Sequence, residues 1–152
     1  MPINREFVGR SFPPAEPYDV SRPKIAEFAD AIGDPSPVYR DPRAAGCLGY
    51  SDVIAPPTFA ILVTLGAAHR AVTDPELGVD WSRVVHASQD FSHRRPITAG
   101  DRLVGTATIE QIRSVGRNET ITVRTDVHTT DGEPVCAGVT ALLVRGPEEQ
   151  AQ

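Results

Sequence analysis

The sequence is poor in lysine, cysteine and aromatic residues. Lys24 is the only lysine, so the basic side chains are almost all arginines. Cys47 and Cys136 are the only cysteines, and they stand far apart and outside any metal-ligand spacing. This pattern argues against a disulfide framework and against a cysteine-based metal centre. We expect both thiols to be reduced, as is usual in the cytoplasm.

We also expect neither a signal peptide nor a membrane span. Residues 1–6 contain no hydrophobic segment of the kind found in signal peptides. The longest apolar stretch, residues 53–68, contains two prolines and falls short of the ~20 residues that a membrane span needs. We therefore expect a soluble, cytoplasmic protein that has no membrane partner.

Positive charge is not in excess. The 152 residues carry 15 basic and 20 acidic side chains, a formal net charge of −5. No basic stripe with interleaved aromatic residues is present, so we expect no nucleic-acid partner. None of the four histidines has a partner at a metal-ligand spacing such as i and i+4: His69, His86, His93 and His128. Walker loops and dinucleotide fingerprints are missing too, and no metal or redox cofactor is expected.

The first half of the chain is predicted to be helical. Apolar residues at helical spacing indicate a short helix over residues 24–32, with Ser21 as its N-cap and Gly33 at its end. Residues 34–54 are rich in proline and glycine and predict a long loop with one short helical turn. A second helix over residues 58–69 is apolar on almost every face, which is typical of a buried helix.

The second half predicts strands over residues 84–94, 103–112, 121–128 and 135–144. The last of these is apolar or small on both faces, so we expect it in the middle of a sheet or at a subunit interface. Helices followed by strands favour an α+β class over a βαβ repeat. We expect a single domain over residues 1–145 and a flexible tail over residues 146–152.

One stretch carries a near-complete motif. Residues 33–41 read Gly-Asp-Pro-Ser-Pro-Val-Tyr-Arg-Asp, which resembles the hydratase motif Gly-Asp-x-Asn/Ser-Pro-x-His-x-Asp of the MaoC-like hotdog family. Residues 96–103 resemble that family's turn between two strands. The resemblance implies a hotdog fold, in which an antiparallel sheet wraps around a long central apolar helix. It also implies a substrate class, the 3-hydroxyacyl thioesters.

The sequence departs from the family pattern at two positions that take part in catalysis in the family. Tyr39 stands where the motif has histidine. A histidine, with a pKa of about 6.5, suits proton transfer near neutral pH, whereas a tyrosine, at about 10, is a poor base. In the family, an amide N–H at the start of the central helix polarises the thioester carbonyl. Here Pro57 falls at that position, and proline has no N–H to donate.

These departures resemble the non-catalytic A-type subunit of the mycobacterial (3R)-hydroxyacyl-ACP dehydratase and related bacterial proteins. In that arrangement a partner chain supplies the catalytic Asp and His, and the A-type chain shapes the acyl channel. The resemblance implies acyl-CoA or acyl-ACP as ligand and a homodimer or a heterodimer with a MaoC-like catalytic subunit. It places Asp34 at the catalytic position and puts a further set of residues against the substrate: Tyr39, Pro56, Pro57, Thr58, Phe59, His93 and Arg94.

The residues themselves leave other roles open. Asp34 is equally suited to an Asp-Pro turn, Tyr39 to filling space, and Thr58 to capping the helix. Arg94, with Arg95 and Arg102, contacts a phosphate of the ligand or is simply solvated. At the level of function, the alternatives are a non-enzymatic homodimer that binds acyl thioesters, and a self-sufficient hydratase or thioesterase.

Overall fold

The computed structural model describes residues 2–147. Its helices are α1 (Arg22–Ala31), α2 (Pro42–Cys47) and α3 (Ile61–Val72), and its 3-10 turns are η1 (Arg5–Phe7), η2 (Pro37–Tyr39), η3 (Pro57–Ala60), η4 (Pro75–Leu77) and η5 (Trp81–Arg83). The strands are β1 (Ser11–Phe12), β2 (Tyr18–Asp19), β3 (Val84–His93), β4 (Arg102–Val115), β5 (Asn118–Thr129) and β6 (Pro134–Val144).

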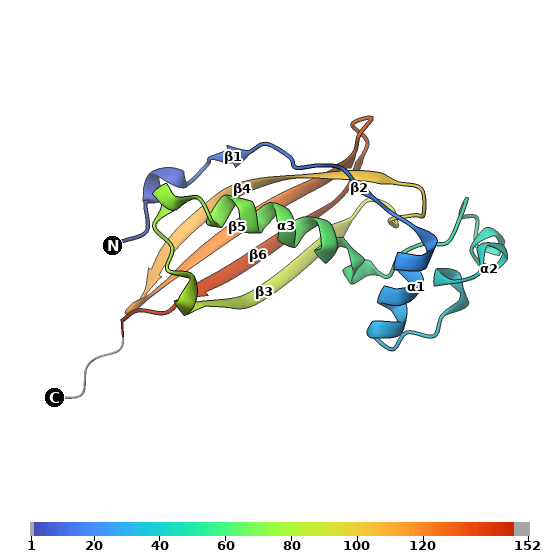
Figure 1. The fold of residues 1–152 in the computed structure, drawn as a ribbon, viewed down its shortest axis with the longest axis horizontal. Coiled ribbons are helices and arrows are strands. Elements are labelled where there is room, and N and C mark those ends of the chain that lie inside the picture. Colours follow the sequence, from blue (N-terminus) through green and yellow to red (C-terminus); the bar gives the residue numbers. More distant parts are fainter. Residues whose placement is uncertain (1, 148–152) are drawn as a thin grey trace.

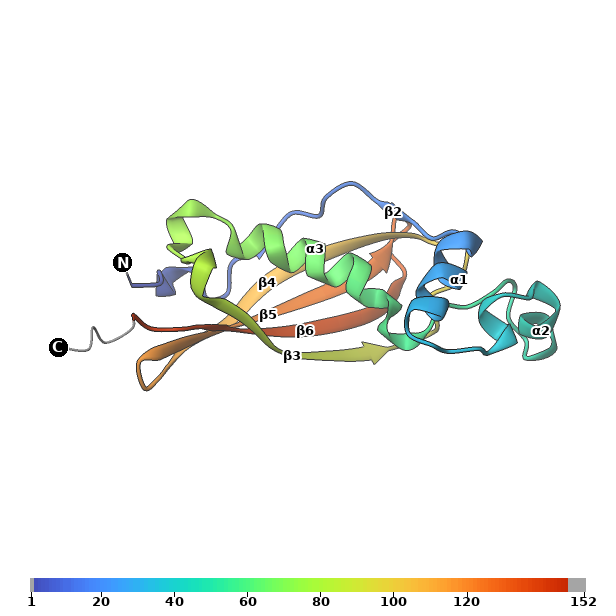
Figure 2. The same cartoon turned by 60° about the horizontal axis from the view of Figure 1, so that its bottom comes forward.

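A single antiparallel sheet carries the fold. Its strand order is β1-β4-β5-β6-β3, and β2 also pairs with β4. α3 lies along one face of this sheet, while α1 and α2 lie beyond one end of it (Figures 1 and 2). β3 is an edge strand, with β6 on one side and no strand from residues 2–147 on the other. This arrangement agrees with the predicted α+β class and with a sheet curved around a helix.

Two glycines let α3 approach the sheet closely. A Cβ built on Gly105 of β4 would lie 3.0 Å from Thr125 Cγ2 and 3.3 Å from Ala67 Cβ of the helix. On Gly138 of β6 it would lie 2.8 Å from Thr64 Cγ2. Side chains at these two positions would push α3 away from the sheet. The two glycines therefore set the distance between α3 and the sheet.

The predicted ends of the first helix are confirmed. Ser21 Oγ accepts the amide of Lys24 at 3.3 Å, and Gly33 follows the helix with φ +73°. The predicted loop over residues 34–54 contains more helix than expected, because η2 and α2 both lie in it. Asp41 caps α2 by accepting the amide of Arg43 at 2.9 Å.

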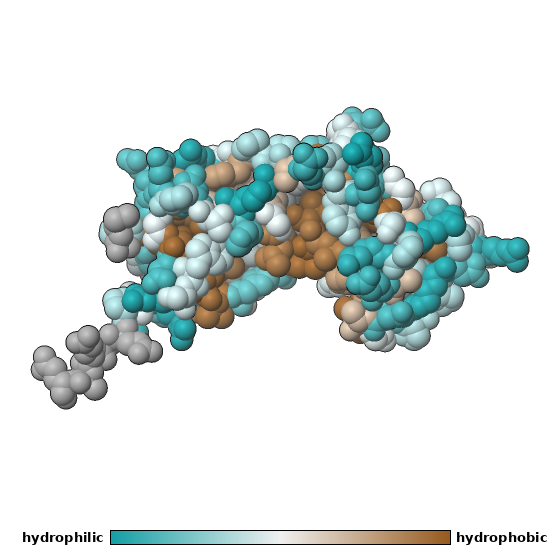
Figure 3. All heavy atoms as spheres, viewed as in Figure 1, coloured by the Kyte–Doolittle hydropathy of each residue, from teal (hydrophilic) through white to brown (hydrophobic). Residues whose placement is uncertain are grey.

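The second helix differs from its prediction in two ways. It begins with the 3-10 turn η3, because Pro56 and Pro57 restrict its first turn, and α3 continues to Val72 instead of ending near His69. It is also not buried on all sides in a single chain, since Leu65 is 44% exposed. One sheet can cover only one face of a helix, and Figure 3 shows an apolar area in the middle of the other face.

All four predicted strands are present, each with ends within a few residues of those expected. β6 lies between β5 and β3, which confirms the first of its two predicted positions, the middle of the sheet. The two-residue strands β1 and β2 were not expected, because pairs of residues carry no periodic signal. Among residues 2–147, no helix is long and apolar enough to cross a membrane. Of the tail predicted over residues 146–152, only Gly146 and Pro147 belong to the described residues.

We predict that Gly138→Ala destabilises the protein by about 1–3 kcal/mol, the usual cost of overpacking a core. The new methyl group would lie 2.8 Å from Thr64 Cγ2, so the helix or the strand must shift. The free energy of unfolding, measured by denaturant titration, checks this. The matched control is Gly46→Ala in α2, where a Cβ would meet no atom within 4 Å. A Gly138→Ala protein as stable as this control would contradict the proposed spacing.

Candidate functional site

The motif loop is folded back on the end of α1 by Arg40. The guanidinium donates to the carbonyl oxygens of Ser36 at 2.9 Å and Asp34 at 2.8 Å, and it pairs with the Asp30 carboxylate at 2.5 Å. Three contacts from one side chain therefore hold the loop on either side of Pro35 and tie it to α1. The sequence analysis assigned no role to Arg40, because the motif allows any residue at its position. The one available sign was that a charged residue lies inside the motif.

Asp34 and Tyr39 are close enough to influence each other. Asp34 Oδ1 accepts the amide of Ser36 at 3.1 Å, which is the geometry of a turn-forming aspartate. Burial raises the pKa of the half-buried Tyr39, and the nearby charge of Asp34 raises it further. Tyr39 therefore keeps its proton at neutral pH and is suited to donating a hydrogen bond, not to accepting a proton.

A hollow of about 330 Å³ lies between the motif loop, the start of η3 and the end of β3. It brings together four of the residues predicted to meet the substrate, namely Tyr39, Pro57, His93 and Arg94. Its remaining walls come from other residues: Ile54, Ala55, Arg95, Pro96 and Ile97. The volume falls at the lower end of the range of small-molecule sites.

Other predicted residues lie outside this lining. Phe59 is fully buried and packs edge-on against Phe28, with ring centroids 5.4 Å apart. Pro56 is buried at the N-terminal end of η3, and Asp34 influences Tyr39 through its charge but does not line the hollow. Thr58 is exposed, and its side chain makes no capping hydrogen bond for η3. Phe59 therefore supports the site from within the core.

The start of η3 has few free amide donors. Pro56 and Pro57 have none, and the amide of Phe59 donates to the carbonyl of Pro56 at 2.9 Å. The amide N–H of Thr58 is the first one after the two prolines, and it has no backbone acceptor within the described residues. If this helix start polarises a carbonyl, the donor is Thr58 N–H, one residue beyond the family's position.

His93 links the end of β3 to the same helix start. Its Nε2 lies 2.8 Å from the carbonyl oxygen of Pro57. A carbonyl oxygen only accepts hydrogen bonds, so Nε2 is the nitrogen that donates here, and Nδ1 takes no part in this contact. The structure thus places a histidine in the hollow that contains Tyr39, although it comes from a different part of the sequence.

The predicted arginine cluster is largely neutralised. Arg95 forms a two-pronged pair with Asp101 at 2.8 and 3.0 Å and reaches Glu133 at 2.8 Å, and these hydrogen bonds raise its pKa. Arg102 pairs with Asp19 at 2.8 Å. Arg94 is exposed and has no carboxylate within 4.0 Å among residues 2–147. Arg94 is therefore the cation of this cluster that remains available to an anion.

The thiols and carboxylates form no metal centre in the part of the chain that is described. No group of three or more His, Cys, Asp or Glu residues is placed to hold an ion among residues 2–147. Cys47 is exposed and Cys136 is buried, and both are free. Burial raises the pKa of the Cys136 thiol to about 11, so it is protonated at neutral pH.

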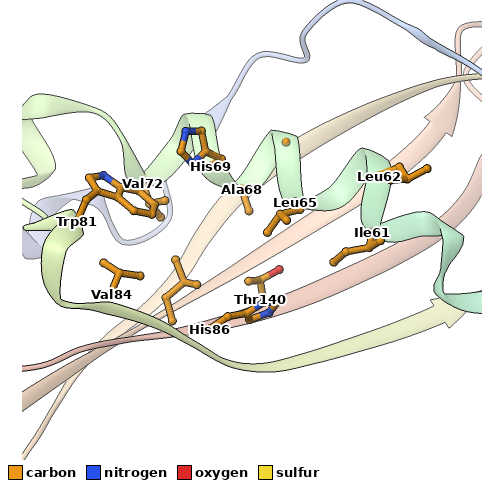
Figure 4. A pocket seen from close by; sticks show the side chains of 12 residues that line it. Ile61, Leu62, Leu65, Ala68, His69, Val72, Trp81, Val84, His86 and Thr140 are labelled. Carbon is orange, nitrogen blue, oxygen red and sulfur yellow. The ribbon is translucent and has the colours of Figure 1, made fainter. Parts of the chain in front are cut away.

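A larger apolar groove of about 600 Å³ runs between α3 and β3. Figure 4 shows Ile61, Leu65, Val84 and Trp81 around it, and its polar side chains include His69, His86 and Thr140. Leu65 and Trp81 are 44% and 41% exposed. A single chain therefore leaves an apolar strip uncovered beside the unpaired edge of β3, which sequence periodicity alone did not reveal.

Comparison with known proteins gives a consistent assignment. The family model described as the FAS1-like, dehydratase domain region matches residues 6–137. A UPF0336 protein of Streptomyces avermitilis is 54% identical over 149 residues, which covers 98% of this chain and 99% of the relative.

Two solved structures are similar throughout the fold. A MaoC-like dehydratase superposes with a TM-score of 0.84 and is 32% identical in sequence. The match covers 91% of this chain but 42% of the dehydratase chain, so this chain spans less than half of that protein. The C-terminally truncated HadBC (3R-hydroxyacyl-ACP dehydratase) complex of Mycobacterium tuberculosis has a TM-score of 0.80 and 26% identity, covering 90% of this chain and 96% of that one. The chain therefore belongs to the FAS1-like dehydratase domain region family and is a MaoC-like hotdog protein.

Proposed function

We propose that this chain is the acyl-binding, non-catalytic subunit of a (3R)-3-hydroxyacyl-thioester dehydratase. The observation that carries the proposal is Tyr39, which occupies the position of the motif histidine beside Asp34 and whose raised pKa keeps it protonated. The reaction takes a proton from the carbon next to the carbonyl and expels the 3-hydroxyl as water, which leaves a trans-2-enoyl thioester. A protonated tyrosine can hold the ligand by a hydrogen bond, but it cannot take that proton.

The base and the acid then come from a second chain. The similar HadBC structure is that of a complex. In this chain the apolar groove lies beside the unpaired edge of β3. A strand of a partner chain would pair with that edge, and a helix of the partner would cover the groove. We infer a heterodimer with a MaoC-like subunit that carries the catalytic Asp and His, or a homodimer when that subunit is absent.

The ligand is an acyl-CoA or acyl-ACP. The hollow around Tyr39 has apolar walls from Ile54, Ala55 and Ile97, with Arg94 at its rim. These walls suit an acyl thioester, and Arg94 suits the phosphate of the carrier group. The role fits a cytoplasmic protein of fatty-acid metabolism that works without a metal or redox cofactor.

One observation favours a second function, a self-sufficient hydratase. His93 lines the same hollow as Tyr39 and uses only Nε2 in its contact with the Pro57 carbonyl, and Thr58 N–H at the helix start has no backbone acceptor among residues 2–147. Together they would supply a base and a carbonyl-polarising donor within one chain. The helix from η3 to α3 contains no Asp or Glu, which counts against a thioesterase with a helix-borne carboxylate.

We predict that the purified chain does not hydrate crotonyl-CoA at ordinary enzyme rates, and that activity appears when a co-encoded MaoC-like chain is added. The reason is that only the partner has a base with a pKa near 7 at the motif position. The measurement is the loss of enoyl-thioester absorbance for each chain alone and for the mixture. Activity of this chain alone, removed by His93→Ala and retained in Tyr39→Phe, would overturn the proposal in favour of the second function.

We predict that Leu65→Glu weakens subunit association by about 100-fold or more, ~2.7 kcal/mol, because it places a charge in the apolar groove. The side chain is 44% exposed in the single chain, so the variant should still fold. Sedimentation velocity across a concentration series measures the change. The matched control is Val8→Glu, at 45% exposure outside the groove. Equal association of both variants would mean that the groove is not the interface.

A further inference from the structure

Three arginines surround an open hollow of about 710 Å³ at the far end of the sheet from the motif loop. Arg83 ends η5, Arg117 lies in the turn between β4 and β5, and Arg145 directly follows β6. Figure 1 shows these element ends together, at the end of the sheet opposite α1 and α2. Leu143 and Asn118 complete much of the wall.

The backbone that carries these arginines is firmly held. The amide of Arg145 donates to the carbonyl of Arg83 at 3.0 Å, and the amide of Gly146 donates to Asn118 Oδ1 at 3.0 Å. A Cβ on Gly146 would lie 2.1 Å from the carbonyl oxygen of Arg117, so only glycine allows this approach. The three segments therefore form one pre-organised unit, and their side chains start from fixed positions.

The positive charge of this hollow is only partly compensated. Arg83 contacts Asp80 at 3.2 Å, but Arg117 and Arg145 have no carboxylate within 4.0 Å among residues 2–147. The whole chain carries a net charge of −5, so the positive charge of these arginines is opposite in sign to that of the chain as a whole. Arginine presents a fork of donors that matches phosphate oxygens, and several arginines around one hollow suit a ligand with several phosphates.

The hollow is distant from the candidate site of the same chain. The candidate site adjoins the start of β6, where the amide of Arg94 donates to the carbonyl oxygen of Val135. The three arginines of the hollow lie beyond the opposite end of β6. At ~3.3 Å per residue the two are roughly 30 Å apart. Arg83, however, directly precedes β3 and His93 ends it. Antiparallel pairing of two β3 edges brings the start of one strand beside the end of the other.

We propose that this arginine hollow binds the phosphate groups of the nucleotide half of an acyl-CoA whose thioester lies in the site of the partner subunit. The inference rests on the proposed function, because it takes the acyl thioester and the dimer from there. It deepens that function by choosing CoA as the carrier, since three arginines match a ligand with several phosphates better than the single phosphodiester of a carrier-protein arm. Each subunit thus helps to bind the ligand of its neighbour.

The direct test uses adenosine 3′,5′-bisphosphate as a probe in calorimetric titrations of the full-length chain at low salt. Arg117→Ala and Arg145→Ala should each weaken probe binding by about tenfold. Both side chains are exposed, so both variants should fold, and their melting temperatures confirm it. The matched control is Arg43→Ala, an exposed arginine of α2 outside the hollow, which should bind as wild type does. Absence of binding, or equal binding by all four proteins, overturns the proposal.

A second titration separates this proposal from the proposed function. With crotonyl-CoA as ligand, Arg145→Ala should lower the affinity of the assembled dimer by about tenfold. The Leu65→Glu chain should still bind the probe, but its crotonyl-CoA affinity should no longer depend on Arg145. If the Arg145→Ala dimer binds crotonyl-CoA as tightly as the wild type, the protein does bind acyl-CoA but the hollow plays no part in it. The proposal of this phosphate site then fails while the proposed function survives. If the arginine variants lose the probe while no protein binds crotonyl-CoA, the phosphate site stands and the acyl-thioester function fails.

Discussion

The rest of the structure depends on the close contact between α3 and one face of the sheet. Gly105 and Gly138 leave room for the helix, and the buried side chains of α3 fill the space between them. This contact fixes the position of the helix start, and therefore of η3, relative to the end of β3. His93 then meets the Pro57 carbonyl at 2.8 Å, and the motif loop closes the hollow from the other side.

The same contact leaves the opposite face of α3 without cover. A single sheet buries one side of the helix, and the apolar groove beside β3 remains open. The edge of β3 is unpaired at the same place, so one partner can satisfy both the apolar surface and the free backbone groups. This pairing of an apolar groove with an open strand edge is what leads us to propose association with a second chain, and with it a division of roles between the two chains.

The strands and the first helix could be predicted from the sequence because each has a regular pattern of its own. The ends of α1 followed from Ser21 and Gly33, and the central position of β6 followed from its apolar residues on both faces. The exposed face of α3 could not be predicted, because composition shows that a helix is apolar but not how many sheets cover it.

The candidate site was only partly predictable for a related reason. Tyr39, Pro57, His93 and Arg94 do line one hollow, but the motif could not show that His93 contacts Pro57 across 36 positions of sequence. Arg40 and Thr58 N–H acquire their roles only through the course of the backbone. Likewise, the three arginines of the distant hollow come from three segments, and no local pattern joins them.

The central claim is that the chemistry belongs to the partner and that this chain supplies binding surface. The most direct measurement is the turnover of crotonyl-CoA by the assembled complex when only the partner's motif histidine is changed to alanine and this chain is unaltered. The account predicts that activity falls to background while the complex and its ligand affinity persist. Retention of activity in that complex would contradict the account, because the remaining base would then have to lie in this chain.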